Sequence, residues 1–286
     1  MRLDDERESS NVEDRRGGGF GGGLPIGGRH IGVGTVVIAL VAWYFGINPS
    51  VVLNTVSGPA QTSQMQSAPP PANDEMAHFV GKVLAETEDT WQVIFKSEGK
   101  QYVDPKLVLY TGSTPTACGT GEAAMGPFYC PGDQKVYIDL AFYQELKDRF
   151  HAPGEFAEAY VIAHEVGHHV QNLLGISERV EREKQRVSEA VANKLSVKVE
   201  LQADCLAGVW AANTDQRNHF LDPGDVEQAI AAATAIGDDR LQKEARGYVV
   251  PDSFTHGTSE QRVRWFRRGM ESGKPGVCNT FTAASL

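Results

Sequence analysis

A long stretch without charge divides this chain of 286 residues. No Asp, Glu, Lys or Arg occurs from Ile31 until Asp74. Residues 31–47 are almost entirely apolar and would form a helix of about 26 Å, or about 34 Å if it continued to Leu53. Because a bilayer core is about 30 Å thick, the run predicts one transmembrane helix over residues 31–53. A buried core helix and a cleaved signal peptide are the alternatives.

The flanks of this run predict its orientation. Residues 1–30 hold five Arg and six acidic residues with Gly runs after them, which is typical of a disordered leader. No Lys or Arg follows the run until Lys82, so the positive-inside rule puts the leader in the cytoplasm. We therefore expect a single-pass anchor in the cytoplasmic membrane, with the N-terminus cytoplasmic and the C-terminal domain periplasmic or otherwise extracytoplasmic.

The remainder of the chain is expected to form one domain. Residues 54–74 are rich in Ser, Gln, Ala and Pro and predict a solvated linker. Residues 75–286 are enough for one hydrophobic core. The net charge of −10 argues against nucleic acid as a partner, because phosphate binding needs a basic face.

Four cysteines fit an oxidising compartment. Cys118 and Cys130 flank a Gly-rich, hairpin-like segment, which favours a local disulfide. Cys205 with Cys278 is then the remaining pair, although four cysteines allow three pairings. A zinc site built from Cys is less expected, because the chain has no Cys-x-x-Cys pair.

The hydrophobic pattern predicts an α+β domain, mainly helical with a small sheet. Strands are expected at 106–110 and 135–140, and a loop at 119–131. Helices are expected at 74–95, 142–150, 154–174, 222–236 and 258–270, with one or two more over 178–213.

The helix at 154–174 contains the sequence His164-Glu165-Val166-Gly167-His168. Two histidines four residues apart project from one face of a helix and can share one zinc ion. Glu165 is offset by about 100° around the helix axis. Its carboxylate therefore lies beside the metal, where it can act as general base and then as general acid. The spacing is that of a helix-borne zinc protease motif.

A third ligand is expected downstream. Glu200 and Asp204 are also four residues apart, in an otherwise apolar stretch where unpaired carboxylates would be costly. We assign Glu200 to the metal and Asp204 to a position behind a ligand histidine, where it fixes the tautomer. The reversed assignment stays open. His169 points away from His168 and is expected to support the site or to lie on the surface.

Several motifs together resemble the YpfJ-type neutral zinc metallopeptidases of bacteria. They are HEVGHH (164–169), ELQADC (200–205), GPFYCP (126–131), VYIDL (136–140), AIGDDRLQ (235–242) and PDSFTHGTSEQR (251–262). The resemblance covers almost the whole chain. It implies a zincin-like domain outside the cytoplasmic membrane.

A more distant resemblance is to HtpX and the CAAX-prenyl endopeptidases, which combine the helix motif with a later Glu-x-x-x-Asp whose Glu binds zinc. They also carry a Thr-His-Pro segment followed by Arg. Here Thr255-His256-Gly257 precedes Arg262, with Gly in place of Pro. By analogy His256 approaches the zinc, as a transition-state donor or a displaceable ligand, while a structural loop histidine is the alternative. Arg262 is expected to pair with an acid.

These features predict a membrane-anchored zinc metalloendopeptidase with one Zn²⁺ per chain. His164, His168 and Glu200 would hold the zinc, whose activated water would attack extracytoplasmic polypeptides with Glu165 as general base and acid. The strand at 135–140 is expected to be an edge strand that binds extended substrate, and Tyr137 would line the site or fill the sheet core. The alternatives are a catalytically silent, zinc-containing binding or assembly module and a latent protease opened by a regulatory partner.

Overall fold

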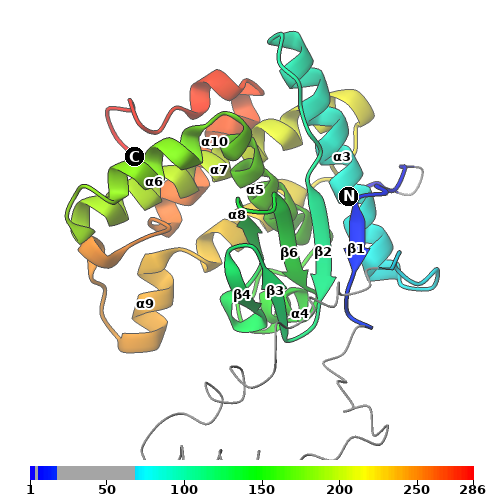
Figure 1. Ribbon diagram of the computed structural model, residues 1–286, viewed down its shortest axis with the longest axis horizontal. Coiled ribbons are helices and arrows are strands. Elements are labelled where there is room, and N and C mark those ends of the chain that lie inside the picture. The colour runs from blue at the N-terminus through cyan, green and yellow to red at the C-terminus, as the bar shows by residue number, and fades with distance from the viewer. Residues whose placement is uncertain (4–5, 18–67) are drawn as a thin grey trace, which may run out of the picture. The chain divides into compact units, whose positions relative to one another are not determined.

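A four-stranded sheet forms one layer of the computed structural model, which describes residues 1–3, 6–17 and 68–286 (Figure 1). Its order is β1 (Val12–Asp14), β2 (Lys106–Tyr110), β6 (Lys135–Asp139), β5 (Phe128–Cys130). β2 runs parallel to β1 and β6, whereas β5 is antiparallel to β6 and forms an edge. The strands β3 (Ser113–Thr116) and β4 (Gly119–Glu122) form a separate hairpin.

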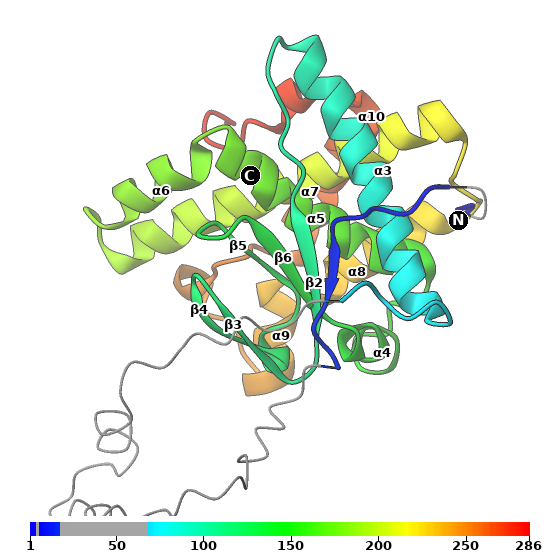
Figure 2. The same ribbon diagram turned by 45° about the vertical axis from the view of Figure 1, so that its right-hand side comes forward.

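Helices pack against this sheet and around one another. They are α3 (Glu75–Ser97), α4 (Ala141–Asp148), α5 (Glu155–Leu173), α6 (Ile176–Lys184), α7 (Glu189–Asn218), α8 (Asp225–Ala235), α9 (Asp238–Arg246) and α10 (Ser259–Ser272). Short 3₁₀ turns are η1 (Ala123–Met125), η2 (Pro251–Ser253) and η3 (Pro275–Cys278). Helix α5 contacts β5 and β6 on one side and α7 and α8 on the other, so it is central (Figure 2).

Glycines let three of these helices approach closely. A Cβ atom on Gly167 of α5 would lie 3.0 Å from the carbonyl oxygen of Ala203 in α7. A Cβ atom on Gly269 of α10 would lie only 1.9 Å from the carbonyl oxygen of Cys205 in α7. The backbones of α7 and α10 are therefore in direct contact at Gly269, where a larger residue would not fit. This contact fixes the position of α7 beside the centre of the domain.

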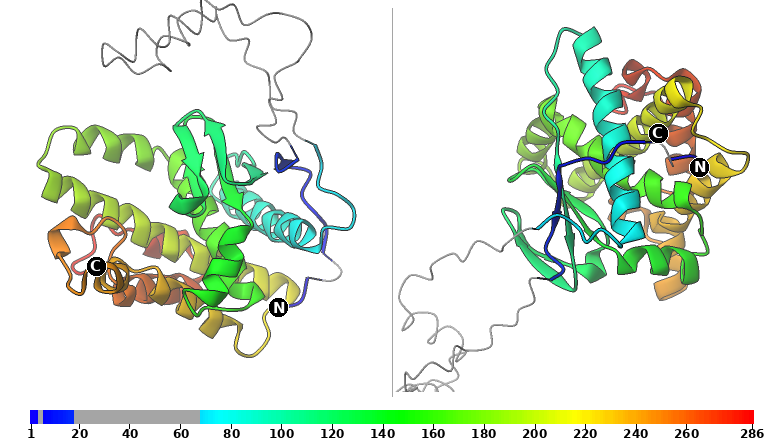
Figure 3. Two further views of the ribbon diagram at one scale, coloured as in Figure 1. Left: turned by 90° about the horizontal axis from the view of Figure 1, so that it is seen from below. Right: turned by 90° about the vertical axis from the view of Figure 1, so that its right-hand side faces the viewer.

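The N-terminal residues belong to the folded domain. Residues 1–14 and 68–286 form one compact unit. Arg7 contacts Glu88 of α3 at 2.9 Å, and Asn11 donates to the same carboxylate at 2.8 Å. Figure 3 shows this segment running beside α3 into β1. The prediction of a disordered cytoplasmic leader over residues 1–30 is therefore wrong for these residues.

The predicted single-pass membrane topology is also wrong. β1 pairs with β2, and Asp14 pairs with Ala68, so residues on both sides of the segment 15–67 share one sheet. A single crossing within that segment would put these partners on opposite sides of a bilayer. Within the described ranges no helix combines the length and apolarity needed to span a membrane. The predicted span at 31–53 and most of the linker at 54–74 lie outside the described residues. The described residues accordingly form a mixed helical domain with small sheets, and no membrane-spanning helix is among them.

Both predicted disulfides are confirmed. Cys118 is bonded to Cys130, and Cys205 is bonded to Cys278. The first joins the β3–β4 hairpin to β5. The second joins α7 to η3. Such bonds form and persist in oxidising compartments.

The predicted helices are confirmed, α9 was not predicted, and the other errors fall on short strands. The expected loop at 119–131 contains β4 and β5, because strands of three or four residues are too short to show an alternating pattern. The strand at 135–140 exists as β6 but is an inner strand, so the prediction that it forms the edge is wrong. β5 occupies that edge.

Candidate metal centre

Three side chains from two helices converge at the centre of the domain. His164 and His168 lie one turn apart on α5, and their Nε2 atoms are 3.2 Å apart. Glu200 of α7 places Oε2 at 3.2 Å from His164 Nε2 and Oε1 at 3.5 Å from His168 Nε2. All three ligand atoms lie within 4.8 Å of one another. Two imidazole nitrogens and one carboxylate oxygen are a donor set that suits a catalytic zinc ion, so these residues fit the metal.

Asp204 lies behind His164 rather than in the triad. Its Oδ1 is 2.8 Å from His164 Nδ1, which directs the opposite nitrogen of the ring toward Glu200. Arg262 of α10 donates to both oxygens of Asp204 at 2.9 Å, and the Tyr160 hydroxyl also donates to this carboxylate. Asp204 is fully buried, so these donors satisfy its charge. In this geometry Glu200, and not Asp204, converges with the two histidines.

The carboxylates shift the pKa values of both histidines. Burial lowers the pKa of His164, but the Asp204 carboxylate outweighs burial and raises the pKa to about 10. For His168, burial is likewise outweighed by Glu200, so its pKa is raised. Burial raises the pKa of Glu200, yet the two histidines hold it well below the ordinary value. A metal ion that binds near neutral pH must therefore displace the proton of His164, and the raised pKa of His168 opposes metal binding in the same way.

Glu165 lies on the same helix, beside the triad. Its side chain lines the cleft described below and is only 7% exposed. Burial raises the pKa of Glu165 above its ordinary value, although both neighbouring histidines oppose the shift. A carboxylate with a raised pKa is a stronger proton acceptor, as a general base requires.

The triad lies in a cleft of about 1160 Å³. Phe128 and Tyr129 of the edge strand β5 line one wall, and charged residues of α6 line another. Apolar side chains also line it, namely Phe142, Phe150, Val161, Val180, Ile236 and Leu241. The cleft is large enough for several residues of a polypeptide and has mixed polarity.

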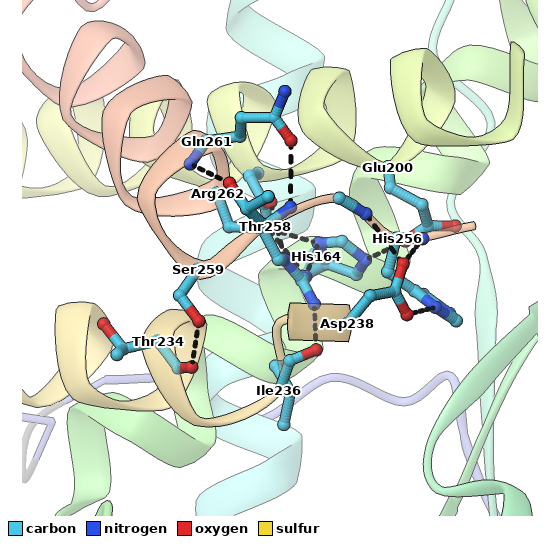
Figure 4. A network of polar contacts seen from close by, with 12 residues as sticks. His164, Glu200, Thr234, Ile236, Asp238, His256, Thr258, Ser259, Gln261 and Arg262 are labelled. Carbon is cyan, nitrogen blue, oxygen red and sulfur yellow. Dashed lines mark hydrogen bonds and ion pairs between the residues drawn. The ribbon is translucent and has the colours of Figure 1, made fainter. Parts of the chain in front are cut away.

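His256 lines the same cleft from the loop before α10 (Figure 4). Its Nδ1 is 3.3 Å from Asp238 Oδ1. Asp238 also accepts three backbone N–H bonds from Thr255, His256 and Gly257, at 2.6–3.0 Å. The Asp238 hydrogen bond raises the pKa of His256 against the effect of burial. The loop is thus fixed by one carboxylate, and His256 is not part of the converging triad.

His169 and Tyr137 do not line the cleft. His169 is fully buried and is held by the Tyr129 hydroxyl at 3.0 Å and the Val103 carbonyl at 2.7 Å. Tyr137 is buried in the sheet, where its ring stacks on Phe128 with centroids 5.0 Å apart. His169 thus anchors the β5 side chain that reaches the cleft.

Sequence reasoning missed three contributors to the centre. Tyr160 lies one turn before His164, where an apolar helix face made it look like an ordinary core residue. Gln171 contacts His168 Nδ1 at 2.9 Å, and Tyr129 comes from a segment read as a loop. The i,i+3 spacing of His168 and Gln171 on one predicted helix face was the available signal for Gln171.

A helix-borne His-Glu-x-x-His motif with a glutamate from a later helix defines a site of the zinc-peptidase class. Residues 1–281 match the family described as "Putative neutral zinc metallopeptidase", and the chain belongs to that family. "Uncharacterized protein YpfJ" of Escherichia coli K12 is 51% identical over 98% of this chain and 99% of its own length. "Uncharacterized protein Rv2575" of Mycobacterium tuberculosis H37Rv is 41% identical over 73% of each chain. No solved structure is significantly similar to the chain.

Proposed function

We propose that the protein is a zinc metalloendopeptidase that hydrolyses peptide bonds in extended polypeptides. His164, His168 and Glu200 would hold one zinc ion per chain. The observation that carries the proposal is the convergence of these three donors in an open cleft, with the buried Glu165 carboxylate beside them. A closed structural zinc site takes four protein ligands and needs no such glutamate.

The chain's own residues have distinct roles in this proposal. When bound, zinc would polarise the peptide carbonyl and lower the pKa of a water molecule. Glu165 accepts the proton of the attacking water and then donates it to the leaving amine nitrogen. Asp204 keeps the proton of His164 on Nδ1. The apolar side chains that line part of the cleft favour apolar substrate side chains.

We further propose that substrate lies along β5. This strand forms an edge of the four-stranded sheet, and its Phe128 and Tyr129 line the cleft. An edge strand offers unpaired backbone groups, which an extended peptide can pair with in any sequence context. Binding by backbone pairing would give affinity, while the cleft would select side chains.

The test compares the full-length wild type with Glu165→Gln. We expect one zinc per chain in both proteins, and cleavage of a peptide library by the wild type alone. Glu158→Gln is the matched control, because Glu158 is on the same helix and burial raises its pKa to about 7, yet it does not line the cleft. Zinc in all three without cleavage in any would favour the silent or latent module instead.

His256→Ala separates the two proposed roles of that residue. If His256 donates a hydrogen bond in the transition state, kcat falls while zinc content stays the same. If His256 restrains a latent site, cleavage increases in the variant.

A further inference from the structure

A chain of side-chain amides runs from His168 away from the cleft. His168 Nδ1 is 2.9 Å from Gln171 Oε1. Gln171 Nε2 is 3.1 Å from Gln202 Oε1, and Gln202 Nε2 is 2.9 Å from the carbonyl oxygen of Cys278. Both glutamines are buried. Three hydrogen bonds thus connect His168 to the backbone of the C-terminal segment.

We call the hydrogen-bonded chain His168–Gln171–Gln202–Cys278 the amide relay. Its end at the Cys278 carbonyl fixes which group donates in every hydrogen bond of the relay. The carbonyl oxygen of Cys278 can only accept, so the amide nitrogen of Gln202 faces it. Gln202 then presents its oxygen to Gln171, whose amide nitrogen donates to it and to the Val199 carbonyl at 2.7 Å. The oxygen of Gln171 is left facing His168, and His168 Nδ1 must be the donor.

The position of this proton determines which nitrogen of His168 can bind a metal ion. With the proton on Nδ1, neutral His168 has its lone pair on Nε2, the atom that faces Glu200. An imidazole binds a metal only through a lone pair, so the relay selects the binding tautomer. His164 obtains the same tautomer from the charged Asp204. The two histidines are therefore oriented by different partners: His164 by the Asp204 carboxylate and His168 by the neutral amide of Gln171.

The relay ends at Cys278, which is also part of the Cys205–Cys278 disulfide. Gln202 and Cys205 lie one turn apart on α7, and both are tied to Cys278, the first by a hydrogen bond and the second by the disulfide. The Thr280 hydroxyl also donates to the Lys198 carbonyl at 2.6 Å. Two hydrogen bonds and one disulfide thus connect the C-terminal segment to one face of α7.

We propose that Gln171 and Gln202 are positioning residues that hold His168 in its metal-binding tautomer, and that the Cys205–Cys278 disulfide anchors the carbonyl group on which this relay depends. The inference rests on the proposed metal site. It makes metal affinity depend on a disulfide that does not contact the metal ligands.

The first test measures zinc affinity of the full-length chain by competition with a chelator. Residues that orient a ligand histidine typically contribute 10–100-fold to metal affinity. We expect losses of about this size for Gln171→Leu and Gln202→Leu. Gln228→Leu is the matched control, because Gln228 also bonds to α5, at Phe156 N, but far along the helix from the triad. Its zinc affinity should not change.

A second variant and a spectrum distinguish orientation from general loss of structure. In Gln171→Glu a carboxylate still accepts from His168 Nδ1 but cannot donate to Gln202 or to the Val199 carbonyl, so zinc affinity should recover only in part relative to Gln171→Leu. In ¹⁵N NMR spectra of the zinc-loaded protein, the hydrogen-bonded Nδ1–H signal of His168 should persist in the wild type and Gln171→Glu and be lost in Gln171→Leu. Thermal unfolding identifies any variant that fails to fold.

The two disulfides of this chain provide an internal comparison. Replacing Cys205 and Cys278 together by Ala should weaken zinc binding, whereas replacing Cys118 and Cys130 together by Ala should not. Equal zinc affinity in all folded variants would overturn the relay while leaving the metal site intact. If the wild type itself binds no zinc, the proposed function fails. The tautomer of neutral His168 in the zinc-free protein then tests the relay alone, and an Nε2–H tautomer would refute it.

Discussion

Arg262→Met is expected to be among the most destabilising single substitutions at this site. Arg262 is 2% exposed and Asp204 is fully buried, and two hydrogen bonds of 2.9 Å join them. Methionine has a similar volume but no charge, so the variant leaves the Asp204 carboxylate buried with only His164 and Tyr160 as partners. Removing one partner of a buried ion pair costs about 3–5 kcal/mol.

This loss converts to a measurable change in melting temperature. For a domain of this size, 1 kcal/mol corresponds to about 2–4 °C, so we expect a decrease of about 6–20 °C. Arg264→Met is the matched control on α10, because Arg264 is exposed and such surface changes stay within about 0.5 kcal/mol. Thermal and urea unfolding of the full-length, metal-free protein would supply both values.

A double-mutant cycle tests the reasoning behind this magnitude. If the cost comes from the contacts that the buried Asp204 carboxylate loses with Arg262, Arg262→Met combined with Asp204→Asn should cost less than the sum of the two single substitutions. The single variant should also bind zinc only at higher pH, because the Arg262 charge lowers the pKa of His164 and its removal raises that pKa. Additive costs, or an Arg262→Met melting temperature equal to that of Arg264→Met, would refute the argument.

Two further outcomes are expected. Asp204 raises the pKa of His164 to about 10 in the folded protein. The proton on His164 therefore contributes fully to the free energy of unfolding below pH ~6.5, the pKa of an unperturbed histidine, and this contribution is lost as the pH rises toward 10. The melting temperature should fall over this pH range in the presence of EDTA but not in the presence of zinc. Gly269→Ala should destabilise by about 3 kcal/mol or more, because the added methyl group meets a backbone oxygen, whereas Gly276→Ala, which meets nothing within 4 Å, should be neutral in the same unfolding assay.

The centre of the site could be predicted because helix geometry fixes it locally. Once residues 154–174 are read as a helix, the four-residue spacing places His164 and His168 on one face. Glu200 and Asp204 stand out by the same spacing, since two carboxylates in an apolar stretch need partners. Gln171 does not stand out, because an uncharged amide on a helix is compatible with either a surface or a buried position.

The N-terminal strand could not be predicted from local pattern. β1 has three residues, two of them acidic, and it is stabilised by pairing with β2 and by contacts of the preceding residues with Glu88. Those partners are more than seventy residues away in the chain. Hydropathy measures how apolar the run at 31–47 is, but it carries no information on whether the residues before and after that run meet. The pairing of Asp14 with Ala68 shows that the residues on the two sides of the segment 15–67 meet.

The different supports of the two histidines follow from the charge balance of a buried site. Ionised Glu165, Glu200 and Asp204 carry three negative charges, and Arg262 carries one positive charge. A divalent metal ion makes this set neutral. A carboxylate in place of Gln171 would add a further buried negative charge, which is costly. The amide relay orients His168 without that charge, whereas Asp204 is tolerated behind His164 because Arg262 neutralises it. In the metal-free protein, protons on the two histidines can supply the same balance, in keeping with their raised pKa values. Zinc binding near neutral pH should therefore release at least the proton of His164, whose pKa is raised to about 10, and calorimetry in buffers of different ionisation enthalpy can count the protons released.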